Sequence, residues 1–224
     1  FSIVKWTGTG SGTTIGHGLG AKPKIIFVKN RSSATNWVVN VGEIVGADER
    51  SLRLNSTNAI MADAAQTDGY TYNNQATTFQ TANGSSGNQN AVNQSGNNII
   101  AYCFKEVTGY SSFGTYTGNG NADGPFIYTG FKPAFVIIKR YGSTGNWVIQ
   151  DNKRPGYNET SLDLNPSNNE AEEANNGIDI VSNGFKQRNT DGDSNASGSG
   201  NTYIYMAFAA APLVGTNNIP ATAR

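Results

Sequence analysis

The chain has little of several residue types on which common functions depend. Its 224 residues include one cysteine and one histidine, and only 14% of them are charged. A single cysteine excludes an internal disulfide, and a single histidine excludes a metal site built from several imidazoles. Sixteen basic and sixteen acidic residues cancel, which leaves no positive excess to attract a nucleic acid or an anionic membrane surface. We therefore expect no nucleic-acid partner.

Long apolar runs are also missing. The longest continuous stretch, Met206 to Val214, is interrupted by Pro212 and falls short of the roughly 18 to 20 residues that a membrane-spanning helix needs. We expect a soluble chain without membrane insertion. The chain opens at Phe1 with neither an initiator Met nor a signal segment, and we expect an upstream portion in a longer protein.

What the chain does contain is turn-forming residues between short β-branched and aromatic runs. Gly, Asn, Ser and Thr are abundant, and this composition favours strands joined by many turns over long amphipathic helices. The clearest predicted strands are residues 25–29, 37–41, 99–104, 135–139, 147–150, 178–181 and 203–208. These features predict an all-β fold.

One stretch of sequence occurs twice. Residues 22–39 read KPKIIFVKNRSSATNWVV, and residues 132–149 read KPAFVIIKRYGSTGNWVI. The offset of 110 residues gives 17 identities over 50 positions when residues 6–55 are compared with residues 116–165. We interpret the repeated stretch as a core hairpin in which Trp37 and Trp147 are packing anchors. The sequence therefore predicts an internal duplication: two tandem, similar antiparallel β-sandwich domains, residues 1–110 and residues 111–224 with a C-terminal tail.

Two polar segments precede the last strand of each copy. Residues 80–98 and 189–202 are rich in Asn, Gly and Ser, and such segments do not bury enough apolar area to order themselves by packing. We expect them to be exposed loops at the same end of both domains. Residues 169–177, NEAEEANNG, are predicted to form a short helical turn.

Residues that could carry catalysis are few. His17 lies in GHGLG, and Ile127 stands 110 residues further on, so we predict a structural role for His17. Cys103 lies among apolar neighbours in IIAYCF and is interpreted as a buried hydrophobe. A pair of carboxylates could hydrolyse glycosides, and the candidates are Asp151, Asp163, Glu170, Glu172, Glu173 and Asp179. Most of them lie in polar stretches where acids are normally solvated, so we predict no catalytic residue and no enzymatic activity.

Metal and cofactor motifs are incomplete. Glycines are frequent from residue 8 to residue 20, but neither a following helix nor a Gly-Lys-Ser/Thr sequence is present to bind phosphate. Asp191, Asp193 and Asn195 match the first ligands of a calcium loop, but Ala196 and Thr202 replace its glycine and its bidentate glutamate. We predict turn glycines, no metal and no cofactor.

Tyrosines offer candidate ligand contacts. The chain has ten of them, and exposed aromatic rings beside amide groups can recognise sugars. The candidates in or beside loops are Tyr70, Tyr72, Tyr141 and Tyr157.

Four segments together carry a resemblance to a known family: TYTGNGNADGPFIYTGFKPAFVIIKR, STGNWVI, SNGFKQRNTD and TYIYMAFAAAPL. They resemble a domain of unknown function found in virion proteins of tailed bacteriophages, often those of marine bacteria, and the resemblance covers both copies. It implies a non-enzymatic virion structural protein, as the C-terminal part of a tail fibre or as a capsid-surface decoration protein. The implied location is the virion.

The same resemblance implies the partners. We expect other virion proteins, copies of the chain itself (a trimer, by analogy with fibres) and host-surface polysaccharide. The alternative is a carbohydrate-binding module of a larger virion-borne or secreted enzyme, and a third hypothesis is a depolymerase acting through loop carboxylates.

Overall fold

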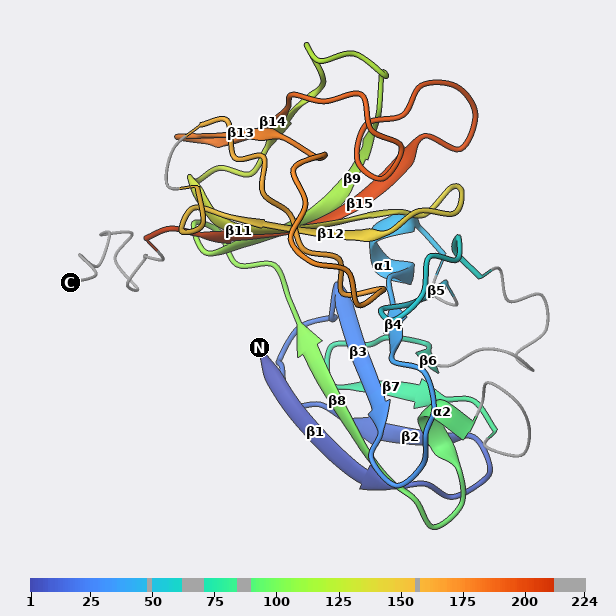
Figure 1. Cartoon of the computed structure of the whole chain (residues 1–224). Coiled ribbons are helices and arrows are strands. Elements are labelled where there is room, and N and C mark those ends of the chain that lie inside the picture. Colours follow the sequence, from blue (N-terminus) through green and yellow to red (C-terminus); the bar gives the residue numbers. More distant parts are fainter. Residues whose placement is uncertain (48–49, 62–70, 84–89, 156–157, 212–224) are drawn as a thin grey trace. The chain divides into compact units, whose positions relative to one another are not determined.

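The chain forms two compact units in a computed structural model that describes residues 1–47, 50–61, 71–83, 90–155 and 158–211. Unit 1 is Phe1–Lys105 and unit 2 is Glu106–Arg224 (Figure 1). The predicted domain boundary after residue 110 lies slightly further along the chain than this division.

Strands dominate both units. Unit 1 contains β1 (Ser2–Thr7), β2 (Thr13–Gly16), β3 (Ile25–Asn30), β4 (Val38–Asn40), β5 (Ser51–Arg53), β6 (Thr71–Tyr72), β7 (Thr78–Thr81) and β8 (Asn98–Phe104), with the short helices α1 (Gly42–Val45) and α2 (Asn90–Asn93). Unit 2 contains β9 (Ser111–Thr117), β10 (Phe126–Tyr128), β11 (Pro133–Arg140), β12 (Trp147–Asp151), β13 (Ile178–Val181), β14 (Gly184–Gln187) and β15 (Thr202–Ala209). The prediction of an all-β fold is confirmed. The helical turn predicted at residues 169–177 is wrong, because Glu173 instead forms an antiparallel bridge with Asp163.

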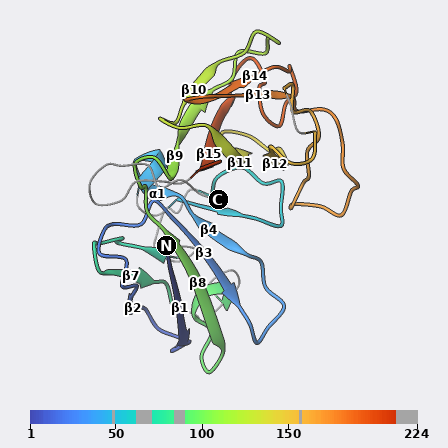
Figure 2. The same cartoon turned by 90° about the vertical axis from the view of Figure 1, so that its left-hand side faces the viewer.

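Within the described ranges, each unit has one large and one small antiparallel sheet. The large sheet has the order β1-β8-β3-β4-β5 in unit 1 and β12-β11-β15-β9 in unit 2, and the small sheets have the orders β2-β7-β6 and β10-β14-β13. Figure 2 shows the small sheet of unit 2 facing its large sheet. The core of each unit lies between the two sheets: one apolar cluster contains Val28 of the large sheet and Phe79 of the small sheet in unit 1, and another contains Val136 and Phe185 in unit 2. Alternation along each strand places these apolar side chains on the inner face.

The two units share one strand order. Strands β1, β8, β3 and β4 correspond to β9, β15, β11 and β12, and β2, β7 and β6 correspond to β10, β14 and β13. This shared order agrees with the sequence repeat, and the duplication itself stays a prediction.

The repeat does not keep one offset throughout. Ile15 pairs with Phe79, and Ile127 pairs with Phe185, so Ile127 is the counterpart of Ile15 and not of His17. The sequence offset changes here because the flanking turns differ in length between the units, and turns accept extra residues that a paired strand cannot. The comparison of His17 with Ile127 is therefore wrong.

The repeated hairpin differs between the units in its tryptophan. Trp147 is fully buried, whereas Trp37 is half-buried and precedes β4. Burial agrees with a packing role for Trp147, although it lies outside the core cluster of unit 2, and Trp37 packs at the surface against Tyr102, with ring centroids 6.4 Å apart. In each unit a lysine of the hairpin binds the backbone of the turn. Lys29 Nζ donates to the Thr35 carbonyl in unit 1, and Lys139 Nζ donates to the Gly145 carbonyl at 2.6 Å in unit 2.

Candidate functional site

A buried asparagine holds the polar loops at one end of unit 2. Asn195 has no exposed surface. Its Nδ2 donates to the carbonyls of Asn121 (2.8 Å) and Asn189 (2.6 Å), and its Oδ1 accepts the Asn119 backbone N–H at 2.9 Å. One side chain thus connects two loops, the one between β9 and β10 and the one between β14 and β15.

Asn93 does the same in unit 1. It is equally buried, it donates to the carbonyls of Ser11 (2.6 Å) and Ala82 (3.1 Å), and it accepts the Thr9 N–H at 3.0 Å. The expectation that the polar segments are simply exposed loops is wrong for Asn93 and Asn195. Composition indicated that apolar packing could not order these segments, but buried hydrogen bonds order them instead.

A glycine directly after the first strand of each unit, Gly8 after β1 and Gly118 after β9, allows the loop that contains the buried asparagine to pack closely against the backbone. A Cβ atom on Gly8 would lie 2.0 Å from the Gln94 carbonyl oxygen, and one on Gly118 would lie 2.6 Å from the Ala196 carbonyl oxygen. No other residue fits there without moving the backbone. Gln94 and Ala196 directly follow the two buried asparagines, so this close packing is common to both units.

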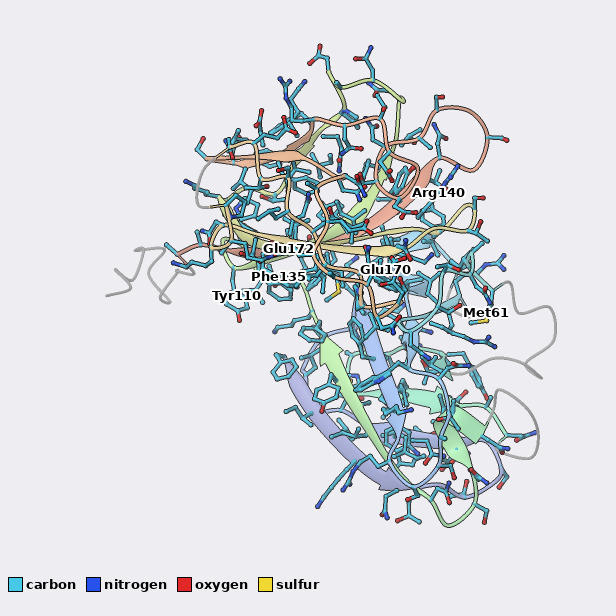
Figure 3. All side chains as sticks on the ribbon, in the orientation of Figure 1. Met61, Tyr110, Phe135, Arg140, Glu170 and Glu172 are labelled. Carbon is cyan, nitrogen blue, oxygen red and sulfur yellow. The ribbon has the colours of Figure 1, made fainter. Side chains whose placement is uncertain are left out.

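The acids that resemble the start of a calcium loop bind amide groups. Asp193 accepts the Asn146 backbone N–H at 2.8 Å and the Asn146 side-chain amide at 2.9 Å. Asp191 Oδ1 accepts the Asp193 N–H at 2.8 Å. Arg140, labelled in Figure 3, donates from Nε to the Gly200 carbonyl at 2.9 Å. Among the described residues no group of three or more His, Cys, Asp or Glu side chains could hold a metal ion.

An exposed aromatic pair stands on the small sheet of unit 2. Phe126 and Tyr128 are 49% and 67% exposed, whereas Ile127 between them is buried in the core. In the adjacent strand Lys186 lies opposite Phe126, and Gly184 lies opposite Tyr128. We call Phe126, Tyr128, Gly184 and Lys186 the aromatic face. Gly184 is required here, because a Cβ atom on it would lie 2.1 Å from the Ile127 carbonyl oxygen and 3.1 Å from the Phe126 ring.

Charged groups border the aromatic face. Asp123 lies 2.7 Å from Lys186 Nζ and 3.8 Å from Arg188, and Arg188 lies 3.4 Å from Asp179. The hydrogen bond from Lys186 lowers the pKa of Asp123, whose side chain is 81% exposed. Exposed pairs of this kind contribute little to stability, so a bound partner can replace them at small cost.

The predicted ligand-binding tyrosines do not form one site. Tyr70 and Tyr157 lie outside the described residues. Tyr72 lies on β6 in unit 1 and Tyr141 follows β11 in unit 2, and both are half-buried. Tyr72 pairs with Gln80, next to Thr14, so it occupies the outward face of the small sheet, the face that carries Phe126 and Tyr128 in the other unit.

Sequence reasoning missed Phe126 and Tyr128. Their signal was the triplet Phe-Ile-Tyr, because strand alternation around a buried isoleucine places both rings outside. The triplet was too short to be recognised as a strand.

His17 and Cys103 have structural roles. His17 is buried, its Nδ1 accepts the Leu19 N–H at 3.1 Å, and its Nε2 donates to the Gln75 carbonyl at 3.0 Å. This arrangement defines a neutral ring, with both nitrogens engaged. Cys103 is buried, and desolvation raises the pKa of its thiol to about 12, so it is no nucleophile at neutral pH.

Two of the acidic residues considered as candidates for hydrolysis, Asp151 and Glu172, form ion pairs that join neighbouring segments of unit 2. Asp151 and Glu172 both bind Arg154, at 2.7 and 3.1 Å, and Glu172 is labelled in Figure 3. Burial opposes ionisation of Asp151, but hydrogen bonds from Arg154 and from backbone N–H groups outweigh it and lower the pKa of Asp151. This is an ion triplet in which the guanidinium satisfies both carboxylates.

The remaining acids also bind their neighbours. Asp163 is buried and accepts hydrogen bonds from Asn175 N–H (3.3 Å) and Asn176 Nδ2 (3.2 Å), and burial raises the pKa of its carboxyl. Glu173 accepts from the Asn175 side chain at 2.8 Å, and Glu170 accepts from Asn168.

The fold and these features define a class: an all-β module with two units of one strand order, ordered polar loops and an exposed aromatic face. The chain belongs to the DUF7483 family, a domain of unknown function whose family model matches residues 1–212. The match therefore runs through both units. No similar protein was found among curated proteins, and no solved structure matches. Over the described part of the chain, no helix has the length and apolar character to cross a membrane.

Proposed function

We propose that the chain is a non-catalytic structural module of a bacteriophage virion, and that it makes contacts at the particle surface as the C-terminal part of a tail fibre or as a capsid-decoration protein. Its partners in this role are neighbouring virion proteins, further copies of the chain in a trimer, and the host surface. The resemblance of the repeated segments to virion proteins supports the location. The aromatic face supports the contact function.

The aromatic face is the observation that carries the proposal. Exposed aromatic rings supply large contact areas with little loss of side-chain entropy, and they are enriched where proteins bind partners. The fold does not require them: the counterparts of Phe126 and Tyr128 in unit 1 are Thr14 and Gly16, which occupy the same register beside Phe79. Their exposure in unit 2 therefore indicates a partner and not a packing need.

The anchored loops suit the same role. Asn93 and Asn195 hold the loop backbones in one arrangement before any partner binds. A surface that is already ordered does not lose conformational entropy on binding, which increases affinity.

The test has two parts. Purified particles of the virus that encodes the chain should contain its peptides by mass spectrometry, and absence of the peptides would refute the virion location. The purified chain should then compete with the particles for adsorption to host cells. A Phe126→Thr/Tyr128→Thr variant should compete at least about tenfold more weakly if the aromatic face contributes about 1.4 kcal/mol or more to binding.

Tyr110→Thr is the matched control, because Tyr110 is also an exposed tyrosine, 42% accessible, outside the aromatic face. Equal competition by the native chain and the Phe126/Tyr128 variant would rule out the aromatic face as the host contact. Sedimentation equilibrium tests the assembly: a monomer at every concentration would remove the trimer.

The second candidate is a carbohydrate-binding module of a larger virion-borne or secreted enzyme. Aromatic rings stack on the apolar faces of sugars, and the charged groups of Asp123 and Arg188 beside the rings could bind sugar hydroxyls. A glycan array separates the two candidates. Binding to defined glycans that depends on Phe126 and Tyr128, together with an enzyme domain in the same gene product, would favour the second.

A further inference from the structure

A cavity of about 300 Å³ lies at one end of the large sheet of unit 1, lined by Lys5, Trp6, Thr7, Arg31 and Asn98. Three neighbouring chain segments form it. Thr7 on β1 pairs with Asn98 on β8, and the Arg31 N–H donates to the Asn98 carbonyl at 2.8 Å. Alternation along β1 places Lys5 and Thr7 on the outer face of the sheet, whereas Trp6 packs on the core beside Phe79.

The cavity carries positive charge. Lys5 and Arg31 are exposed, and within the described residues neither forms an ion pair. Two rows of paired residues cross β1, β8 and β3 on the outer face of this sheet end. One row consists of Lys5, Ile100 and Lys29, and the other consists of Thr7, Asn98 and Arg31, which directly follows β3. No acidic residue occupies either row. In a chain with no net charge, this is a local concentration of positive potential.

Unit 2 shows that the fold does not need these charges. There Thr117 pairs with Thr202, and the Tyr141 N–H donates to the Thr202 carbonyl at 3.0 Å. By the same register Thr115 is the counterpart of Lys5, and Tyr141 is the counterpart of Arg31. Unit 2 keeps a lysine, Lys139, at the position of Lys29, but it has neutral residues at the positions of Lys5 and Arg31, so these two cations of unit 1 require another explanation.

We propose that this cavity binds an anionic group of a glycan, a carboxylate or a phosphate. Arg31 provides a planar guanidinium that can bind two oxygens at once, Lys5 provides a second cation, and Thr7 and Asn98 provide hydrogen bonds to neighbouring hydroxyls. The volume lies at the lower end of the range for small-molecule sites, so it suits one acidic sugar residue of a longer chain. The inference deepens the proposed contact with the host surface, and it rests on that function for its biological role.

Because both cations are exposed, binding depends on ionic strength. Screening shortens the reach of exposed charges to about 10 Å at 0.1 M salt and about 3 Å at 1 M salt. We therefore expect weak binding by a single acidic residue, and a marked loss of affinity as the salt concentration rises.

The experiment is a calorimetric titration of the full chain with three ligands: an oligogalacturonate, its methyl ester and mannose 6-phosphate. The variant Lys5→Thr/Arg31→Tyr introduces the residues that unit 2 carries at these positions, so the sheet end should fold normally. The control Lys132→Thr/Lys153→Thr removes two exposed positive charges from unit 2. Circular dichroism and thermal unfolding check that both variants are folded.

We expect the oligogalacturonate to bind, the methyl ester to bind at least about tenfold more weakly, and the Lys5/Arg31 variant to lose at least about tenfold in affinity while the control variant does not. Tighter binding of mannose 6-phosphate would identify phosphate as the source of the anion and would support the cavity equally. Equal binding of acid and ester, or equal binding by the Lys5/Arg31 variant and the native chain, would overturn the proposal. The Phe126→Thr/Tyr128→Thr variant should keep this binding, so failure here is distinguishable from failure of the aromatic face.

Discussion

Replacing Asn195 by alanine should destabilise unit 2 strongly. The substitution removes two hydrogen bonds to the carbonyls of Asn121 and Asn189 and one from the Asn119 N–H. These hydrogen bonds are only partly buried, so each backbone group that loses its partner should cost about 1 kcal/mol, at the lower end of the range for buried groups. A water molecule that enters the space left by the shorter side chain recovers part of this, so we expect a loss of about 2 to 3 kcal/mol out of a total stability of about 5 to 15 kcal/mol.

Urea denaturation followed by circular dichroism and by tryptophan fluorescence measures this loss. With a slope of about 1 to 3 kcal/mol per molar urea, the midpoint of the affected transition should fall by about 1 M. The matched control is Asn183→Ala, since Asn183 is an exposed turn residue and its substitution should cost no more than about 0.5 kcal/mol. If Asn195→Ala loses less than about 1 kcal/mol, or no more than the control, then the asparagine does not hold the loops.

Three further predictions concern buried or paired groups. Cys103 should not react with a thiol reagent at pH 8 in the folded chain and should react on denaturation, because its pKa is about 12 and it is buried. Burial lowers the pKa of Lys139 to about 8, below its unfolded value of about 10.4. The unfolded chain therefore binds more protons in this window, so the native chain should gain stability relative to a Lys139→Met variant as the pH rises from about 8 to about 10.4, measured by urea denaturation across that range. Arg154→Leu should cost about 1 kcal/mol at pH 7. Because the pKa of Asp151 is lowered in the folded chain, that cost should shrink as the pH falls below about 4, and a cost that stays constant would contradict the ion triplet.

The strands could be predicted because their residues signal them locally. The segments around Ile26, Val136 and Tyr203 combine β-branched and aromatic residues with flanking turn residues, and each forms a strand close to the expected bounds. Short strands such as β6 and β10 were missed, because two or three residues do not establish a period. The counterpart of His17 was misassigned because an offset taken from paired strands does not hold through a turn.

The loop anchors and the cavity could not be predicted. Asn93 and Asn195 lie in segments full of asparagine, and nothing in composition distinguishes a buried asparagine from an exposed one. Their role depends on backbone groups that are distant in the sequence, such as that of Ser11 for Asn93. The same applies to Lys5 and Arg31, which become neighbours only through the pairing of β1, β8 and β3.

The contacts of the buried asparagines are made with main-chain atoms. The partners of Asn195 are a backbone amide and two backbone carbonyls, whatever side chains those residues carry. The hydrogen bonds of Asn195 themselves therefore do not depend on the side chains of their partners, although the Asn119 and Asn121 side chains also bind the backbone of their own loop. A library that randomises the exposed Ala122 while retaining Asn119, Asn121 and Asn195 should yield folded members, so new surface chemistry can be introduced at this loop without redesigning its backbone.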